Sequence, residues 1–222
     1  IQLSQQSMMP DDLLKPLSPT EARSLIAYLA GSGQVPLLAT ADTLKGFFNG
    51  LDLSGWQGDT SLWSVENGEI VGRTRGLKQN EFLKNELIFG DFRFRVDVQL
   101  ADNQGNSGIQ FRSEAMDDGV VKGYQADIGQ NWWGKLYEEH GRALLWPKSG
   151  EQHVKRGWNT YEIEAVGSRV RTWINGQLCV DLDDAAGAKR GIFALQLHSG
   201  GATEVRFKNF EIELDPKPAN SK

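Results

Sequence analysis

Hydrophobic and polar residues alternate with a period of two over most of the chain after about residue 46. From Phe92 to Leu100 every even position is apolar, and the positions between them are arginine, aspartate or glutamine. The same alternation runs through 161–165 and 170–174. Such a pattern is typical of antiparallel strands that turn one face to a core and the other to water. It predicts half-buried strands at these three places.

Short turns separate the predicted strands. Asn67-Gly68 and Asn175-Gly176 each stand between two apolar runs, and both residues of such a pair accept the positive φ that a two-residue hairpin requires. Near the end of the chain the apolar phase changes around Asn209, which predicts a β-bulge. About a dozen short strands without helical patterns between them predict an all-β sandwich or barrel.

The first 40 residues follow a different pattern. Ser18, Pro19 and Glu21 form a capping-box sequence, and apolar residues then recur at helical spacing until Gly31. This predicts one short helix over about residues 19–30, followed by a linker. We therefore expect a helical segment with its linker over 1–40, a β domain over 41–214 and a disordered tail over 215–222.

Composition excludes several classes of protein. The 222 residues carry a formal net charge of −5, without the clustered lysine and arginine of a nucleic-acid surface. The single cysteine, Cys179, excludes an intrachain disulfide. No apolar run approaches the ~20 residues of a membrane span. We therefore expect no nucleic-acid partner and no membrane-spanning segment.

Three predicted strands share an unusual polar face. In 107–112, 123–128 and 191–198 the apolar residues occupy one phase and polar residues occupy the other. If the three strands are neighbours, one sheet face carries amides, a guanidinium, a carboxylate and an imidazole, from Gln110, Arg112, Gln125, Asp127, Gln196 and His198. This mixture suits a polyhydroxylated ligand, and Gly108 and Gly123 would leave room near the backbone. The alternative is an ordinary solvated face.

The segment after the second of these strands holds further candidates. Trp132 and Trp133 stand in a loop-like stretch and are candidates for stacking on a sugar ring, although one of the two is expected in the core. Glu138 and Glu139 point to opposite faces of an extended segment, so at most one of them faces a site. His198 precedes a glycine-rich turn at a strand end, where site residues are common.

Motifs for other chemistries are missing from the sequence. No histidine, cysteine or glutamate spacing is typical of a metal site, and there is neither a nucleophile elbow nor a phosphate-binding glycine motif. The sequence therefore identifies no metal-binding residues and no cofactor in this chain, and a need for a divalent metal stays open.

Several short motifs, taken together and in order, resemble the 3-keto-disaccharide hydrolase domain family. They are FFNGLDLSGW (47–56), WSV (63–65), GDF (90–92), GNSGIQFR (105–112), GYQADI (123–128), GKLYE (134–138), GWN (157–159), WING (173–176) and LQLH (195–198).

The resemblance covers residues 45–214 and implies a concanavalin A-like (LamG-like) jelly-roll sandwich that cleaves glycosides whose sugar is first oxidised at C3. It maps the family's ligand face onto Gln110, Arg112, Gln125, Asp127, Tyr137, Glu138 and His198. Gln196, Trp132 and Trp133 are further expected substrate contacts. The strand with paired carboxylates that endoglucanases of this fold carry is missing, which argues against ordinary retaining hydrolysis.

Residues 7–31 are similar to the last segment of a class I c-type cytochrome, in which Met8 or Met9 would match the methionine that ligates haem iron. The Cys-x-x-Cys-His attachment motif does not occur in this sequence. We therefore expect the C-terminal part of a longer, exported haem protein, with haem possible only upstream and an extracytoplasmic (periplasmic or secreted) location.

A mechanism follows as a hypothesis. A ketone at C3 acidifies the hydrogen at C2, so a base can remove it and expel the glycosidic oxygen from C1. We assign Asp127 or Glu138 as the base, His198 as the acid, and Arg112 with Gln110 as donors to the keto oxygen. Elimination and net hydrolysis are both open. So are two non-catalytic alternatives, a carbohydrate-binding module and a protein-interaction sandwich.

Overall fold

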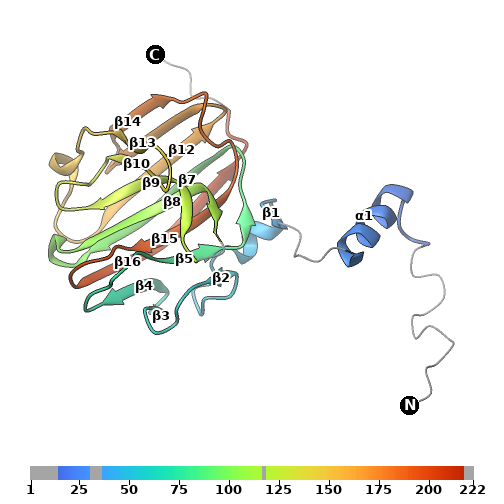
Figure 1. Cartoon of the computed structure of the whole chain (residues 1–222), viewed down its shortest axis with the longest axis horizontal. Coiled ribbons are helices and arrows are strands. Elements are labelled where there is room, and N and C mark those ends of the chain that lie inside the picture. The colour runs from blue at the N-terminus through green and yellow to red at the C-terminus, as the bar shows by residue number, and fades with distance from the viewer. Residues whose placement is uncertain (1–14, 31–36, 117–118, 218–222) are drawn as a thin grey trace. The chain divides into compact units, whose positions relative to one another are not determined.

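The structure is a computed structural model that describes residues 15–30, 37–116 and 119–217 (Figure 1). The chain divides into two compact units, residues 1–36 and residues 37–222. The second unit, called the β unit below, starts slightly before the expected boundary because the short strand β1 (Leu37–Leu38) pairs in parallel with β6 (Leu87–Ile88).

The first unit contains the helix α1 (Pro19–Ala30), as the capping sequence predicted. Ser18 and Glu21 satisfy each other's backbone groups, with Ser18 N–H donating to Glu21 Oε2 at 2.8 Å and Glu21 N–H donating to Ser18 Oγ at 3.3 Å. This reciprocal pair satisfies two backbone donors that the first turn of a helix leaves free.

Two seven-stranded sheets make up most of the β unit. Sheet I has the strand order β11-β10-β9-β8-β15-β5-β2. Its strands are β2 (Trp56–Gln57), β5 (Glu81–Asn85), β8 (Asn106–Ala115), β9 (Val121–Gly129), β10 (Leu136–Glu139), β11 (Ala143–Trp146) and β15 (Ile192–Leu197).

Sheet II has the strand order β14-β13-β12-β7-β16-β4-β3. Its strands are β3 (Trp63–Glu66), β4 (Glu69–Thr74), β7 (Phe92–Leu100), β12 (Asn159–Val166), β13 (Arg169–Ile174), β14 (Gln177–Asp183) and β16 (Thr203–Leu214). Three single-turn 3-10 helices, η1 (Thr43–Gly46), η2 (Ala101–Asn103) and η3 (Glu151–His153), lie in the connections. Neighbouring strands of each sheet are antiparallel, which confirms the predicted all-β jelly-roll sandwich.

The core fills the space between the sheets because each strand turns its apolar phase inward. Phe94 of β7 stacks on Phe193 of β15 with ring centroids 4.7 Å apart, so the two sheets meet through aromatic rings. Phe111 and Tyr124 stack side by side on β8 and β9 at 5.3 Å. Each fully buried ring of this kind contributes about 1.5–3 kcal/mol of transfer free energy.

The predicted turns are confirmed. Asn67 and Gly68 have φ of 53° and 78°, and Asn175 and Gly176 have φ of 51° and 77°, which are the values that a two-residue hairpin turn needs. At Asn209, with φ of 55°, the pairing of β16 with β7 shifts register.

Some expectations fall outside the described part of the chain. Met8 and Met9 lie in the undescribed stretch 1–14, so the cytochrome-like segment and the extracytoplasmic location stay predictions. Residues 218–222 of the expected tail are likewise not described, whereas Asp215 N–H still donates to the carbonyl of Asp91 at 3.0 Å. Among the described residues, no helix has both the length and the apolar character needed to cross a membrane.

Candidate functional site

The strand register brings four of the predicted polar residues, Gln110, Gln125, Asp127 and Gln196, together on the outer face of sheet I. In one row across the strands, Gln110 of β8 pairs with Gln125 of β9, and Gln125 pairs with Tyr137 of β10. In the next row, Gln196 of β15 pairs with Gly108, which pairs with Asp127. The prediction that these strands are neighbours is confirmed.

A chain of hydrogen bonds runs through this face. Ser113 Oγ donates to Gln110 Oε1 at 2.9 Å, Gln110 Nε2 donates to Gln125 Oε1 at 2.8 Å, and Gln125 Nε2 donates to Asp127 Oδ1 at 2.7 Å. All four side chains are buried. The chain fixes which atom of each amide points toward its neighbour, and it leaves Gln110 with both amide atoms already bonded.

The glycines of this face make room for protein side chains. A Cβ on Gly108 would lie 2.5 Å from Cδ of Gln125, and a Cβ on Gly123 would lie 2.5 Å from Oγ of Ser113. The expectation that these glycines leave space for a ligand is therefore wrong. Their role is to let Gln125 and Ser113 lie flat against the sheet.

Asp127 is the electrostatically unusual residue of the face. Its side chain is only 2% exposed, and burial raises the pKa of Asp127 from the ordinary value of 3.8 to about 7. The hydrogen bond from Gln125 acts against this rise, and the nearby Glu139 carboxylate adds to it. The second oxygen, Oδ2, is buried without a hydrogen-bond partner among the described residues. A carboxyl group with these properties is protonated in a large fraction of molecules at neutral pH.

Gln196 belongs to the same row as Asp127 and is fully buried. Neither its Oε1 nor its Nε2 makes a hydrogen bond to a described residue. An unpaired buried amide usually costs about 1–3 kcal/mol, and such costs concentrate where a protein has a use for the polar group.

A cavity of about 230 Å³, called the site cavity below, opens on this face. Its walls are Asn80, Asn106, Gln125, Asp127, Trp132, Tyr137, Glu139 and His198. Asn80 joins two of these walls, because its Oδ1 accepts from Ser199 N–H at 2.9 Å and its Nδ2 donates to Glu139 Oε1 at 3.2 Å.

His198 has a defined tautomer. Its Nδ1 lies 2.6 Å from the carbonyl oxygen of Ser199. Because a carbonyl only accepts, Nδ1 carries the proton in this bond, and in the neutral ring Nε2 keeps its lone pair. His198 therefore offers an acceptor at Nε2, rather than the donor expected from the sequence, whenever the ring is neutral.

The two tryptophans have different environments. Trp132 is 38% exposed in the wall of the site cavity, with the Lys135 ammonium 4.5 Å from its ring centroid. Trp133 is 1% exposed, and its indole N–H donates to Asn103 Oδ1 at 2.7 Å. Only Trp132 can stack on a ligand at this site, and the expectation that Trp133 contacts the same ligand is corrected.

Glu138 points away from the site cavity. On β10 it alternates with Tyr137 and Glu139, and it binds Arg142 at 2.6 Å. Arg142 also binds Asp184 at 2.6 Å, and Arg142 holds the pKa of Glu138 below its ordinary value. Glu138 is therefore outside the site cavity, whereas Glu139 lines it. Tyr137 and Glu139 are two positions apart and so share a face, a signal that the sequence already contained.

Arg112 also lies elsewhere, next to a register shift in β8 with φ of 46°. Its buried guanidinium points to the end of the sandwich, where it donates to the carbonyls of Gly90, Ala165 and Gly167 at 3.1, 3.0 and 2.8 Å and to Asp91 Oδ1 at 2.7 Å. The expectation that Arg112 donates to a substrate from the outer face is corrected, because these partners occupy its guanidinium group.

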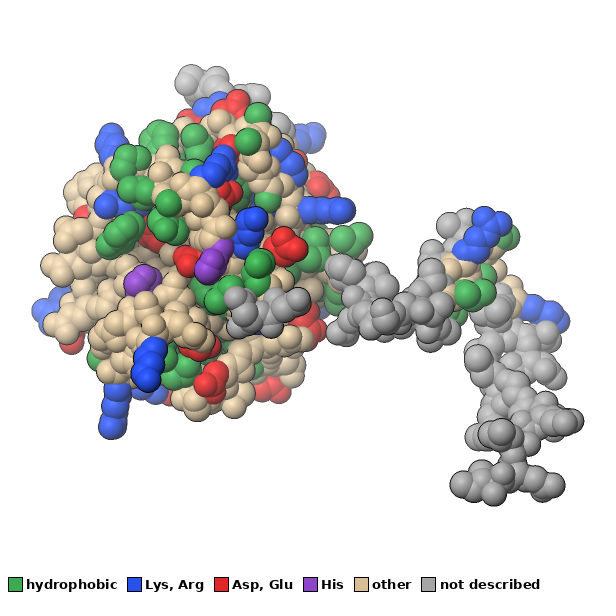
Figure 2. Space-filling view, viewed as in Figure 1, with side chains coloured by type: hydrophobic (Ala, Val, Ile, Leu, Met, Phe, Trp, Pro, Cys, Tyr) green, Lys and Arg blue, Asp and Glu red, His purple; other side chains and the backbone are tan. Residues whose placement is uncertain are grey.

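Sequence reasoning missed Asn80 and Asn106. Asn106 occupies the same phase of its strand as Gly108 and Gln110, so the alternation of the sequence could have identified it. Asn80 lies in the connection before β5, where no periodicity marks it. Among the described residues, no group of three or more histidine, cysteine, aspartate or glutamate side chains is arranged to hold a metal ion. Figure 2 shows acidic and basic side chains interspersed over the visible face of the β unit.

Comparison with known families gives a match over most of the chain. The model of the 3-keto-alpha-glucoside-1,2-lyase-like domain family matches residues 43–213. A search of curated proteins gave no match.

Solved structures with the same fold include several carbohydrate-related proteins. The carbohydrate-binding module CBM66 from Bacillus subtilis is 22% identical with a TM-score of 0.55, over 72% of this chain and 95% of that one. A proposed glycosyl hydrolase from Parabacteroides distasonis is 19% identical with a TM-score of 0.58, over 81% of this chain and 99% of that one. A B. subtilis protein with a galectin-like fold is 11% identical with a TM-score of 0.57, over 81% and 93%. At these identities the likeness shows the fold.

Proposed function

Because the chain belongs to the family of 3-keto-alpha-glucoside-1,2-lyase-like domains, its function is carbohydrate-related, and we propose that its site cavity cleaves 3-keto-glycosides by elimination across C1 and C2. The observation that carries the proposal is the pairing in one small cavity of Asp127, with a pKa of about 7, and the carboxylate of Glu139.

The reaction needs one base and one acid. The ketone at C3 acidifies the C2 hydrogen, so a base removes that proton and an enolate forms. The enolate electrons then form the C1–C2 double bond while the C1–O bond breaks, and an acid protonates the departing oxygen. Atoms and electrons balance without water, and water adds to the unsaturated sugar only if net hydrolysis follows.

A site that holds one carboxyl group in its protonated form beside a second carboxyl group can supply both an acid and a base. Asp127 holds a proton near neutral pH because it is buried, so we assign it as the acid for the leaving oxygen. Glu139 accepts a hydrogen bond from Asn80 and lines the same cavity, so we assign it as the base at C2. This assignment replaces Glu138, whose carboxylate is bonded to Arg142 outside the cavity.

The enolate oxygen needs hydrogen-bond donors. The Asn106 amide and the Tyr137 hydroxyl line the cavity, and neither side chain bonds to another described residue. We assign them as donors to the C3 oxygen. His198 offers Nε2 as an acceptor for a sugar hydroxyl. Gln110 and Arg112 are not free for this role, since their polar atoms bond within the protein.

The size of the cavity limits the substrate. A volume of about 230 Å³ lies below the range of about 300–1,000 Å³ that drug-sized ligands occupy. It is compatible with one sugar ring, and Trp132 at its wall offers an exposed ring face to the group attached at C1.

Incubation with the 3-keto derivative of methyl α-glucoside tests the proposal. We expect release of methanol and a conjugated enone, seen by ultraviolet absorbance and mass. Asp127→Asn and Glu139→Gln should each lower the rate by about a hundredfold to ten-thousandfold. Glu138→Gln, which removes the neighbouring carboxylate outside the cavity, should keep most of the rate.

Two results would contradict the assignment. If Glu138→Gln abolished turnover of the folded protein while Glu139→Gln left it intact, the base would be misassigned. If the wild type bound the 3-keto-glucoside without turnover, the second candidate function, a carbohydrate-binding module, would take its place. The exposed Trp132 at the cavity wall favours that alternative.

A further inference from the structure

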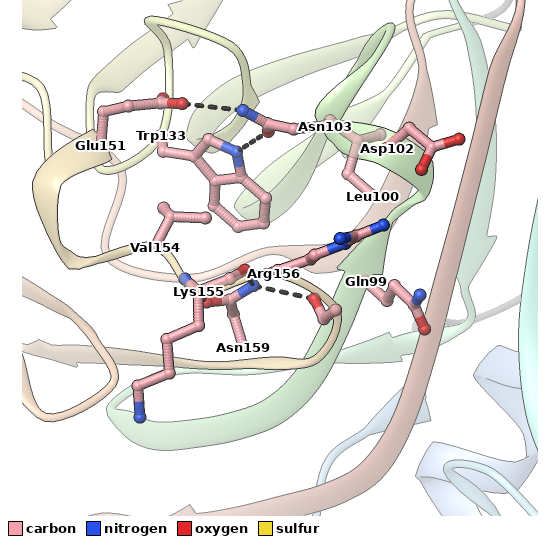
Figure 3. Close-up of a pocket in the computed structure, with 11 residues that line it drawn as sticks. Gln99, Leu100, Asp102, Asn103, Trp133, Glu151, Val154, Lys155, Arg156 and Asn159 are labelled. Carbon is pink, nitrogen blue, oxygen red and sulfur yellow. Dashed lines mark hydrogen bonds between the residues drawn. The ribbon is translucent and has the colours of Figure 1, made fainter.

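A second and larger cavity, of about 650 Å³, lies beside Trp133 (Figure 3). Trp132 lines the site cavity, whereas Trp133 lines this larger one. The remaining walls come from the end of β7, the turns η2 and η3 and the connection 154–157. The volume falls within the range of about 300–1,000 Å³ that is typical of ligand sites.

The walls of this cavity are held in place by side-chain hydrogen bonds. Asn103 is bonded on both sides, because its Oδ1 accepts from the Trp133 indole and its Nδ2 donates to Glu151 Oε1 at 2.8 Å. Glu151 also accepts from Asn131 N–H at 3.0 Å, which fixes the loop that carries the tryptophans. Figure 3 shows the first two of these bonds at the top of the cavity.

The opposite wall is equally well defined. Asn159 Oδ1 accepts from Lys155 N–H at 2.7 Å, and Asn159 Nδ2 donates to the carbonyls of Lys155 and Gly157 at 2.9 and 3.0 Å. The connection that carries Arg156 is therefore ordered before any ligand arrives, which lowers the entropic cost of binding.

The polar side chains that line the cavity include cations, an anion and an amide. Arg156 and Lys155 form no ion pair with a described residue, and Figure 3 shows Arg156 reaching across the cavity toward Leu100 and Gln99. The Asp102 side chain bonds to no other described residue and offers an acceptor, and Gln99 offers both a donor and an acceptor. The two acidic and two basic side chains of the wall balance in charge, so the cavity does not select an anion.

Apolar side chains form the floor between these groups. Leu100, Val154 and Trp133 line it. A sugar presents C–H groups on its ring faces and hydroxyl groups, each a donor and an acceptor, around its edge. A guanidinium fork, an amide and a carboxylate around an apolar floor match that chemistry.

We propose that this larger cavity is a second carbohydrate-binding site, which takes a neutral oligosaccharide and acts separately from the site cavity. Arg156 is its principal hydrogen-bond donor, and Asp102 is its principal acceptor.

Binding of neutral hexasaccharides, namely cellohexaose, maltohexaose and laminarihexaose, to the Asp127→Asn protein tests this site without turnover. Isothermal titration and tryptophan fluorescence should detect at least one of the three. Arg156→Gln should weaken binding about tenfold or more, as expected for lost charge-assisted hydrogen bonds. Arg190→Gln is the matched control, because Arg190 is exposed and lies in neither cavity wall.

Three outcomes would overturn the proposal: no binding of any of the three sugars, equal weakening by Arg156→Gln and Arg190→Gln, or preferential binding of a hexagalacturonate. The test is independent of the proposed catalysis. Arg156→Gln should leave turnover of the 3-keto-glucoside unchanged, whereas loss of that turnover in the Asp127 variant should leave hexasaccharide binding intact.

Discussion

The outer faces of the two sheets are built on the same alternation but differ in chemistry. Sheet II carries arginines paired with acidic residues that are mostly at least partly exposed, as in Arg73 with Glu204 at 2.8 Å and Arg95 with Glu211 at 3.8 Å. Its exception is Glu164, which is buried between Arg93 and Arg171. Sheet I instead buries amides and a carboxyl group, with Gln110, Gln125 and Asp127 joined in one hydrogen-bonded chain.

This difference shows what each face is suited for. Charged pairs on an exposed sheet keep their hydration and need little exact geometry. Buried amides lose their hydration, so each must have a partner or leave a group free for a ligand. Asp127 Oδ2 and the Gln196 amide have no partner among the described residues, and both lie on the face that carries the site cavity. The two faces therefore respond differently to substitution and to pH.

The largest expected effect is on the pH dependence of stability at Asp127. Its native pKa of about 7 lies above the ordinary 3.8, so the native state binds more protons between these values. Stability is therefore lost as the pH rises through that window, by up to about 4 kcal/mol. Asp127→Asn removes the titration, so the variant should be more stable than wild type at pH ~8 and similar to it at pH ~4.

Urea unfolding of both proteins across this pH range measures the effect. A difference in unfolding free energy that stays constant with pH would show that Asp127 does not titrate as inferred. The Asn side chain can still accept from Gln125, so the hydrogen-bonded chain is preserved in the comparison.

The next effect in size concerns Gly108. A Cβ there would meet Cδ and Cγ of Gln125 at 2.5 and 2.6 Å, so Gly108→Ala must displace the centre of the hydrogen-bonded chain. We expect a loss of about 1–3 kcal/mol together with loss of turnover. Gly90→Ala is the control, because nothing lies within 4 Å of a Cβ at Gly90. Equal thermal stabilities of the two variants would show that Gln125 has room to move.

The contrast between the faces also explains which parts of the fold and the site could be predicted from the sequence. The apolar residues at every second strand position predicted the sandwich, because burying one face of a strand requires only that these side chains be apolar. The same phase placed Gln110, Gln125 and Asp127 on one face. The alternation gave the wrong face for Arg112, because a register shift with positive φ in β8 turns its side chain inward. Such a shift leaves no mark in the alternation.

The residues that line the cavity were harder to predict than the sheet face on which it lies. The choice between Glu138 and Glu139 depended on which phase of β10 faces outward, and Arg142 decides it by binding Glu138 on the other side. Asn80 reaches the site through a connection whose path depends on tertiary contacts with Ser199 and Glu139. The raised pKa of Asp127 arises from burial, which the sequence does not show.

A smaller effect on stability, a gain instead of a loss, is expected at Gln196. Gln196→Met replaces an unpaired buried amide by an apolar side chain of similar volume, so it should raise the unfolding free energy by about 1 kcal/mol. Gln110→Met is the matched control. It should lower stability, since it leaves Gln125 Oε1 without its donor, whereas Ser113 Oγ still has the carbonyl of Phe111 at 3.0 Å. If both substitutions changed stability in the same direction, hydrogen bonding would not distinguish the two amides.

The smallest effect is expected on sheet II, where Glu204 accepts from Arg73 and Arg206 at the surface. Glu204→Gln should cost at most about 1 kcal/mol, and less in about 1 M salt, because exposed pairs are weak and screened. Arg73 holds the pKa of Glu204 below its ordinary value, so this contribution is present at neutral pH and is lost as the pH falls, the reverse of Asp127. Urea unfolding of wild type and variant at low and high salt measures it. A cost that persists in high salt would mean that sheet II, like sheet I, depends on desolvated polar contacts.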